Sequence, residues 1–171
     1  MKDSMARQKK TQTRAPLSRE RVLTQALQLA DESGIESLSM RKLAEALGVK
    51  AMSLYNHVKN KDDIIDGLVD IVASEIELPD VRADWKSSMR KRANSAHDVL
   101  LQHPWATMEM VSRVNIGPAM LCYVDATIGC LREAGFSFEM ADHAWNAMDA
   151  LIYAFTLQEL NFPFEAEEYS E

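Results

Sequence analysis

The sequence predicts an all-α fold, in which a small amino-terminal helical domain is joined by a connecting helix to a larger helical domain. Apolar residues recur with helical spacing along much of the chain, and no segment shows the alternation typical of strands. The 171 residues include ten Met but only six Gly and five Pro, which favours helices over a turn-rich β fold. At 47% hydrophobic residues, the chain can build a real core.

The first domain follows a basic arm. Residues 1–16 carry five Lys or Arg and lack the apolar stretch of a signal peptide, so we expect a flexible arm. A first helix is predicted after Ser18 and ends at Gly34. Its inward residues share helical spacing and are Val22, Ala26, Leu29 and Ala30.

Two short helices with a tight turn between them come next. Ser39 is expected to cap the first of them, and Gly48 to end it in the left-handed conformation. Its apolar face has the spacing i, i+3, i+4, i+7 and comprises Met40, Leu43, Ala44 and Leu47. After Val49, a second short helix is expected to turn Leu54 and Val58 inward. This pattern is typical of a helix-turn-helix that enters the major groove of DNA.

Five more helices are expected. The fourth helix of the chain starts near Asn60, with Asp62 and Asp63 well placed in its first turn, and stops at Leu78-Pro79. Further helices are predicted at 85–102, 105–112, 118–134 and 138–160. The helix at 118–134 is apolar nearly all round, so we expect it to be central and buried. The chain then divides into an arm (1–16), a helix-turn-helix domain (17–62) and a second helical domain (63–171).

Charge is distributed unevenly between these parts. Residues 1–61 hold 12 Lys or Arg and 6 Asp or Glu, a net +6, whereas residues 62–171 hold 7 and 20, a net −13. The two values give the net −7 of the chain. A basic end on an acidic body is typical of a DNA-binding domain attached to a domain with another task.

The helix-turn-helix segment resembles the tetracycline-repressor (TetR) family of bacterial regulators. The resemblance rests on the runs Arg41-Lys42-Leu43-Ala44, Leu47-Gly48-Val49, Leu54-Tyr55 and His57-Val58-Lys59-Asn60-Lys61. It is close over residues 18–70 and looser beyond them. It implies a helix-turn-helix DNA-binding domain, a connecting helix and a ligand-binding and dimerisation domain. The implied function is that of a transcriptional repressor, released from an inverted-repeat operator by a small-molecule inducer.

The resemblance also implies which residues hold the DNA backbone. Tyr55, His57 and Lys61 are expected to bind phosphates, and Lys61 stands where the amino end of a helix attracts anions. Structural alternatives remain open: Tyr55 as a half-buried core residue and His57 as a helix-end residue.

For base reading, the resemblance points to Arg41 and to the start of the second short helix. Arginine can bind guanine O6 and N7 together. The other candidates near it are Ser39, Lys50, Ala51, Met52, Ser53 and Asn56. Because Ala51 and Met52 offer only apolar contacts, for example to thymine methyl groups, we expect an operator that differs from that of the tetracycline repressors.

The second domain is expected to bind a largely apolar inducer. Candidate lining residues are the aromatic, Met and His residues of its helices: His97, Trp105, Met108, Met110, Tyr123, Trp145 and Met148. The alternative is that the same residues are plain core. Glu77 stands where the tetracycline repressors carry a histidine that binds magnesium–tetracycline, so we expect no metal site and no cofactor.

A homodimer is implied by the resemblance, and the last predicted helix has small residues that allow close helix approach: Ala141, Ala144, Ala147, Ala150 and Ala154. The acidic segment 165–171 has the pattern of a further helix turn, so we expect a truncated or unusually short domain. This leaves dimerisation open. The alternative function is a helical interaction protein whose DNA contacts are auxiliary.

Other classes of protein are disfavoured. The four histidines are scattered and no catalytic or phosphate-loop motif is present, so we expect no enzyme. Cys122 and Cys130 lie two helical turns apart, about 12 Å, too far for a disulfide, and we expect core residues of a reducing cytoplasm. The weakly charged run 118–131 is too short to span a membrane.

Overall fold

A computed structural model describes residues 16–162 of the chain, and within this range it contains helices and no strands. The elements are α1 (Arg19–Ser33), the short 3₁₀ helix η1 (Ile35–Ser37), α2 (Met40–Leu47), α3 (Ala51–Leu54), α4 (Lys61–Glu75), α5 (Trp85–Gln102), α6 (Pro104–Ser112), α7 (Pro118–Glu133) and α8 (Phe138–Asn161). The predicted all-α fold is confirmed. The basic arm, apart from Pro16, and the acidic segment 165–171 lie outside the described residues.

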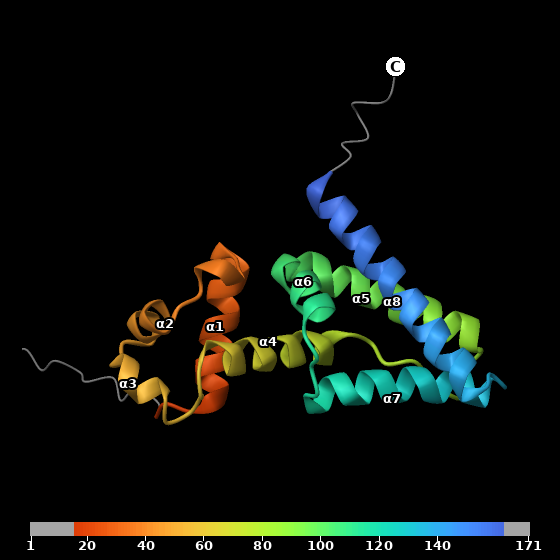
Figure 1. The fold of residues 1–171 in the computed structure, drawn as a ribbon, viewed down its shortest axis with the longest axis horizontal. Coiled ribbons are helices and arrows are strands. Elements are labelled where there is room, and N and C mark those ends of the chain that lie inside the picture. Colours follow the sequence, from red (N-terminus) through yellow and green to blue (C-terminus); the bar gives the residue numbers. More distant parts are fainter. Residues whose placement is uncertain (1–15, 163–171) are drawn as a thin grey trace, which may run out of the picture.

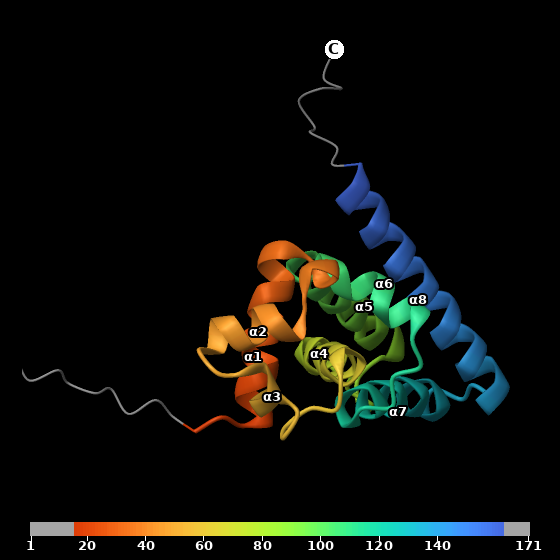
Figure 2. The ribbon, with the colours of Figure 1, turned by 60° about the vertical axis from the view of Figure 1, so that its left-hand side comes forward.

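Helix α4 lies in the middle of the molecule. The helices α1–α3 form a head on one side of it and the helices α5–α8 form a body on the other (Figures 1 and 2). One apolar core runs through both parts, from Val22 in α1 through Leu68 and Val72 in α4 to Ile152 in α8. A second, smaller cluster joins α5, α7 and α8 around Met89 and Leu131. Head and body therefore pack as one continuous structure.

Five helices begin at a residue whose side chain caps them, including the predicted cap Ser39. The side chains of Ser18, Ser39, Asn60, Asp84 and Ser137 each accept a hydrogen bond from a main-chain N–H three residues further on. These bonds satisfy N–H groups that the first helical turn leaves without a partner. Local sequence thus determines where these five helices begin.

Helix α4 ends earlier than the sequence predicted. It stops at Glu75, and Ile76 adopts an extended conformation (φ −75°, ψ 129°) instead of continuing the helix to Leu78. The change of direction buries Ile76 in the core, and Ser95 of α5 accepts a hydrogen bond of 2.8 Å from the main-chain N–H of Glu77. Packing against α5 therefore ends the helix before the proline does.

The prediction of a central, buried α7 is wrong. This helix packs against α4 and α8 through one face only, which carries Tyr123, Thr127, Cys130 and Leu131. On its other side Leu121 is 54% exposed and Cys122 is exposed as well. Cys130 is thus a core residue as expected, whereas Cys122 is not.

Candidate functional site

The head presents a short helix on a tight turn. Gly48 ends α2 in the left-handed conformation (φ 65°, ψ 38°), where a side chain would be strained. Helix α3 is only four residues long, because the chain already turns at Tyr55. Leu54 and Val58 are buried as predicted and hold this segment on the core. The segment is therefore fixed from the inside, and its outer side is free to contact a partner.

The ten candidate DNA contacts gather at this end of the molecule. Seven are exposed: Ser39, Arg41, Lys50, Ala51, Met52, Tyr55 and Asn56. Ser53, His57 and Lys61 are half-buried. Met52, which is 76% exposed, and Tyr55, which is 47% exposed, are large apolar side chains that the described part of the protein leaves open to solvent. Tyr55 is therefore not a core residue.

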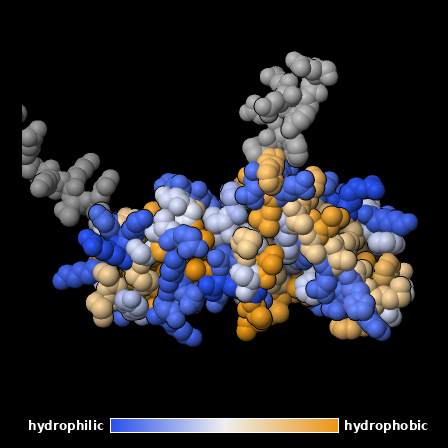
Figure 3. All heavy atoms as spheres, turned by 45° about the horizontal axis from the view of Figure 1, so that its top comes forward, coloured by the Kyte–Doolittle hydropathy of each residue, from blue (hydrophilic) through white to orange (hydrophobic). Residues whose placement is uncertain are grey.

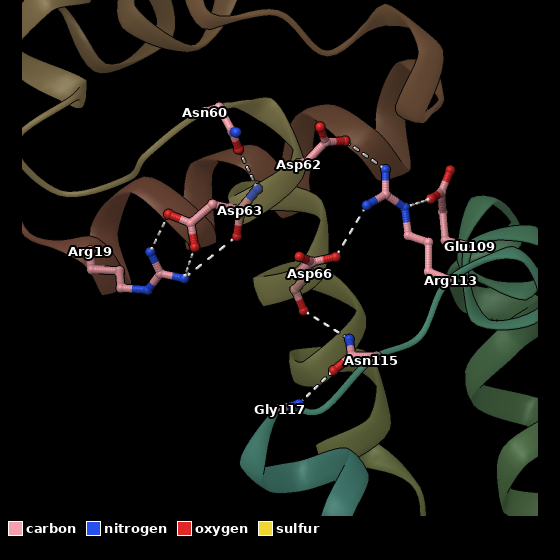
Figure 4. Close-up of polar contacts among 9 residues, drawn as sticks. All are labelled: Arg19, Asn60, Asp62, Asp63, Asp66, Glu109, Arg113, Asn115 and Gly117. Carbon is pink, nitrogen blue, oxygen red and sulfur yellow. Dashed lines mark hydrogen bonds and ion pairs between the residues drawn. The ribbon is translucent and has the colours of Figure 1, made fainter.

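The amino end of α4 adjoins this surface, and several of its polar groups are already engaged (Figure 4). Asn60 accepts a hydrogen bond of 2.8 Å from the N–H of Asp63, so this N–H is not free for a phosphate. Arg19 of α1 binds both carboxylate oxygens of Asp63, at 2.8 and 3.0 Å. This ion pair raises the pKa of Arg19 and lowers that of Asp63, in both cases chiefly through the hydrogen bonds between them. Sequence reasoning assigned Asp63 only to the helix dipole and missed Arg19.

The body contains a half-open cavity of about 600 Å³ between the end of α6, α7 and α8. This volume suits a drug-sized molecule. Two of the seven expected lining residues, Met110 and Trp145, line it. Its other walls come from the end of α6, the α6–α7 connection, α7 and α8: Val111, Arg113, Val114, Asn115, Met120, Val124, Asn146, Asp149, Ala150, Tyr153, Ala154 and Leu157.

The other five expected lining residues lie elsewhere. His97 contacts Thr156 and Glu159, Trp105 donates a hydrogen bond to Asp31 of α1, and Met108 is largely exposed. Met148 packs against the second apolar cluster, and Tyr123 is buried beside Asp149. Helical spacing alone could not separate residues that line the cavity from residues that make other contacts. Each face of an internal helix meets a different neighbour, and the spacing does not say which.

A buried polar cluster lies behind one wall of the cavity and reaches it through Asp149 and Trp145. Asp149, at 6% exposure, accepts hydrogen bonds from Arg92 (2.8 Å), the Tyr123 hydroxyl (3.0 Å) and the Trp145 indole (2.7 Å). Burial raises the pKa of Tyr123 and of Tyr153, and the nearby Asp149 carboxylate raises both further. The tyrosines are therefore neutral donors at physiological pH. Asp149 is charge-compensated by Arg92, so the wall is polar without net charge.

One arginine of the cavity wall also binds the amino end of α4 (Figure 4). Arg113 pairs with Asp62 at 2.8 Å and with Asp66 at 3.1 Å on α4, and with Glu109 on α6 at 2.5 Å. These carboxylates, Asp62 first, raise the pKa of Arg113, so it stays charged. Asn115, another wall residue, donates to the main-chain oxygen of Asp66. The cavity wall and the start of α4 are thus joined directly.

Two further observations limit the chemistry of the described residues. Between residues 16 and 162, no group of three His, Cys, Asp or Glu side chains is arranged to hold a metal ion. None of the helices described has both the length and the apolar character needed to cross a membrane.

The comparisons with known proteins fit this geometry. Residues 22–68 match the sequence model of the bacterial regulatory proteins of the tetR family, and residues 78–171 match that of the tetracyclin repressor-like C-terminal domain. An HTH-type transcriptional regulator of Saccharopolyspora erythraea is 35% identical over 75% of this chain and 55% of its own length. The class C tetracycline repressor protein of Escherichia coli is 32% identical over 91% of this chain and 72% of its own length.

Solved structures show the same architecture. The TetR family protein ActR of Streptomyces coelicolor, in complex with actinorhodin, has a TM-score of 0.80 at 31% identity, covering 87% of this chain and 72% of that one. A TetR variant of Acinetobacter baumannii in complex with minocycline has a TM-score of 0.77 at 27% identity, covering 90% and 88%. The chain spans about half the length of the first two curated relatives, 55% and 46%.

Proposed function

Because the chain belongs to the TetR family of bacterial regulatory proteins, we propose that it is a ligand-responsive transcriptional repressor, which binds an inverted-repeat DNA operator and is released by a small molecule. The observation that carries the proposal is the Arg113 contact, which joins the wall of a ligand-sized cavity to the helix that borders the DNA-binding surface. The family is regulatory rather than enzymatic. We place the protein in the cytoplasm, where its DNA would be.

The exposed outer side of the helix-turn-helix supports the DNA-binding part of the proposal. Arg41 and Lys50 supply positive charge, and Met52 supplies an apolar group for base edges. Phosphate contacts from Tyr55, His57 and Lys61 would provide most of the affinity, and base contacts the selectivity.

The cavity supports a largely apolar ligand with an aromatic portion. Trp145 and Tyr153 supply aromatic rings, and apolar aliphatic side chains form most of the remaining wall. ActR with actinorhodin and the A. baumannii protein with minocycline are relatives that hold ring compounds. A ligand that displaces Arg113 or Asn115 would release the start of α4 and so shift the head. For this, the ligand must bind the arrangement with these contacts broken more tightly than the arrangement with them formed.

An apolar surface on α8 supports a homodimer. Leu151 and Phe155 in α8 and Phe162 directly after it are 57% to 70% exposed. Apolar side chains gather around the C-terminal half of α8 and the α6–α7 connection (Figure 3). Patches of this kind mark interaction sites. Replacing Leu151 and Phe155 by Glu should therefore convert a dimer to a monomer in sedimentation at micromolar concentration, and a wild-type monomer would contradict the dimer.

The function can be tested by selecting duplexes from a random DNA library with the full chain and measuring their affinity by fluorescence anisotropy. We expect an inverted repeat that survives competition from scrambled DNA at physiological salt. Arg41→Ala should relax the preference at one base pair, at a cost of about 1–3 kcal/mol, whereas Arg132→Ala, the same charge change on the body, should not. Equal binding to all duplexes would instead favour an interaction protein with auxiliary DNA contacts.

A compound screen by loss of the anisotropy signal would then test ligand release. Filling the cavity from α7 by Val124→Trp should abolish the response to an active compound while leaving DNA binding intact, because Val124 lies outside the apolar surface of α8. A compound that still releases the Val124→Trp variant would act outside the cavity.

A further inference from the structure

Three carboxylates lie in the first two turns of α4, at the end that adjoins the DNA-binding surface: Asp62, Asp63 and Asp66. Negative charge there opposes phosphate binding. Asp62 and Asp66 are 69% and 53% exposed and pair with Arg113, whereas the side chain of Asp63 is only 22% exposed. Asp63 is therefore the least exposed of the three carboxylates.

The contacts of Asp63 converge on the turn between α3 and α4. Arg19 binds its two oxygens through two nitrogens, and the same guanidinium donates to the main-chain oxygen of His57 at 3.2 Å. One Asp63 oxygen also accepts a hydrogen bond of 2.7 Å from the N–H of Lys59. A two-pronged arginine–carboxylate pair fixes direction as well as distance. Both ends of the 57–59 segment are thus attached to one ion pair.

The segment held in this way contains His57 and is followed, after Asn60, by Lys61, and both are expected to bind phosphate. Lys59 ends the segment and adds a further positive charge. If the turn is already ordered in the free protein, binding to DNA does not have to pay the conformational entropy of ordering it. Arg19 comes from the other end of the domain sequence, 44 residues before Asp63, so α1 helps to shape a surface that it does not itself present.

We propose that the Arg19–Asp63 pair is a positioning element for DNA binding, which holds the 57–59 turn so that His57, Lys59 and Lys61 meet the phosphates together. The proposal rests on the proposed function. Arg19 acts through the turn, and Asp63 strengthens DNA binding in spite of its negative charge.

The sign of the Asp63→Ala effect tests this directly. If Asp63 were only a charge near the phosphates, its removal would tighten DNA binding. As a positioning residue, its removal should weaken binding about tenfold, the loss of one charge-assisted interaction, and lower the slope of affinity against salt by about one phosphate contact. Glu36→Ala, an exposed carboxylate of the head, gives the matched charge change and should tighten binding slightly. Tighter binding by Asp63→Ala would overturn the proposal.

Arg19 has its own matched pair of variants. Arg19→Ala should weaken DNA binding by a similar factor, and Arg19→Lys should restore it only in part, because an ammonium cannot bind both oxygens and the His57 carbonyl in the same geometry. Arg132→Ala changes the net charge equally at the far end of α7 and should have little effect. Equal losses for Arg19→Ala and Arg132→Ala would leave Arg19 without a positioning role.

Hydrogen exchange of the full chain without DNA separates this proposal from the proposed function. The N–H of Lys59 should exchange faster in Arg19→Ala and Asp63→Ala than in the wild type, while the N–H groups of the α2 core keep their protection. Failure of the wild type to bind DNA would refute the function alone. Unchanged exchange at Lys59 would refute the positioning role alone.

Discussion

The head and the body bury different kinds of side chain. Every buried residue between 16 and 61 is apolar, from Val22 to Val58. The body buries seven polar or charged residues instead: Ser88, Arg92, His103, Thr107, Thr127, Asp149 and Thr156. A closely packed apolar core gives a surface of fixed shape, as reading DNA requires. Buried polar groups cost stability unless they are paired, and they are the groups that can recognise a ligand.

The largest effect should come from breaking the buried ion pair of the body. Asp149→Leu leaves Arg92 charged, buried and without its carboxylate, which should cost about 3–5 kcal/mol of unfolding free energy. The double variant Arg92→Met/Asp149→Leu removes both charges and should recover most of that loss. Denaturant unfolding of the three proteins measures the difference. If the single variant were as stable as the double variant, leaving Arg92 buried without its carboxylate would cost no stability, which would contradict the prediction.

A close approach between α4 and α7 should give the next largest effect. A Cβ on Gly117 would lie 2.2 Å from an oxygen of Asp70, whose carboxylate accepts a hydrogen bond of 2.9 Å from the N–H of Met120. Gly117→Ala must therefore move Asp70 away, at a cost of about 1–3 kcal/mol.

Gly129, which lies inside α7, provides a control for Gly117, which directly precedes that helix. A Cβ there meets no atom within 4 Å, so Gly129→Ala should stabilise the protein by up to about 1 kcal/mol through helix propensity. Thermal unfolding measures the effect of both substitutions. Equal changes in melting temperature for Gly117→Ala and Gly129→Ala would show that Asp70 rearranges without a cost in stability.

A pair of equal changes in the two regions should separate stability from DNA binding. Ser39 caps α2 in the head and Ser137 caps α8 in the body, each through a bond from an N–H three residues on. Replacement of either by Ala should cost about 1 kcal/mol. Only Ser39→Ala should also weaken DNA binding, because α2 carries Arg41. Similar losses of DNA affinity for both variants would mean that stability alone controls binding.

The smallest effect should be a dependence on pH at the joint between head and body. His103, between α5 and α6, contacts Asp31 of α1 at 2.8 Å and Glu75 of α4 at 3.2 Å. Burial lowers the pKa of His103, but the hydrogen bonds to these carboxylates outweigh it, so the pKa is raised.

A raised pKa fixes the direction of this dependence. The stabilisation is complete below the pKa of histidine in the unfolded chain, about 6.5, and is lost as the pH rises through the higher pKa of the folded protein. The melting temperature of the wild type should therefore exceed that of His103→Gln most clearly at low pH, and the difference should shrink as the pH rises. A difference that grows with pH would contradict the assignment.

The sequence predicted more of the head than of the body. In the head, the positions of the three helices, the Ser39 cap and the Gly48 end of α2, and the buried Leu54 and Val58 are confirmed. The predicted DNA contacts gather on one exposed surface, although their roles stay a prediction. In the body, the helices are confirmed, but the structure brings only Met110 and Trp145 of the expected lining residues to the cavity.

By itself, the sequence determined where helices begin and which class of fold they build, because caps and apolar spacing act between residues about three to eight positions apart. Tertiary structure decided which face of α7 meets solvent, which residues surround the cavity, and which carboxylates Arg19 and Arg113 bind. The Arg19–Asp63 contact joins positions 44 residues apart, and the Arg113–Asp62 contact joins positions 51 apart. Such contacts depend on how whole helices pack, and no local sequence pattern predicts contacts between positions so far apart in the chain.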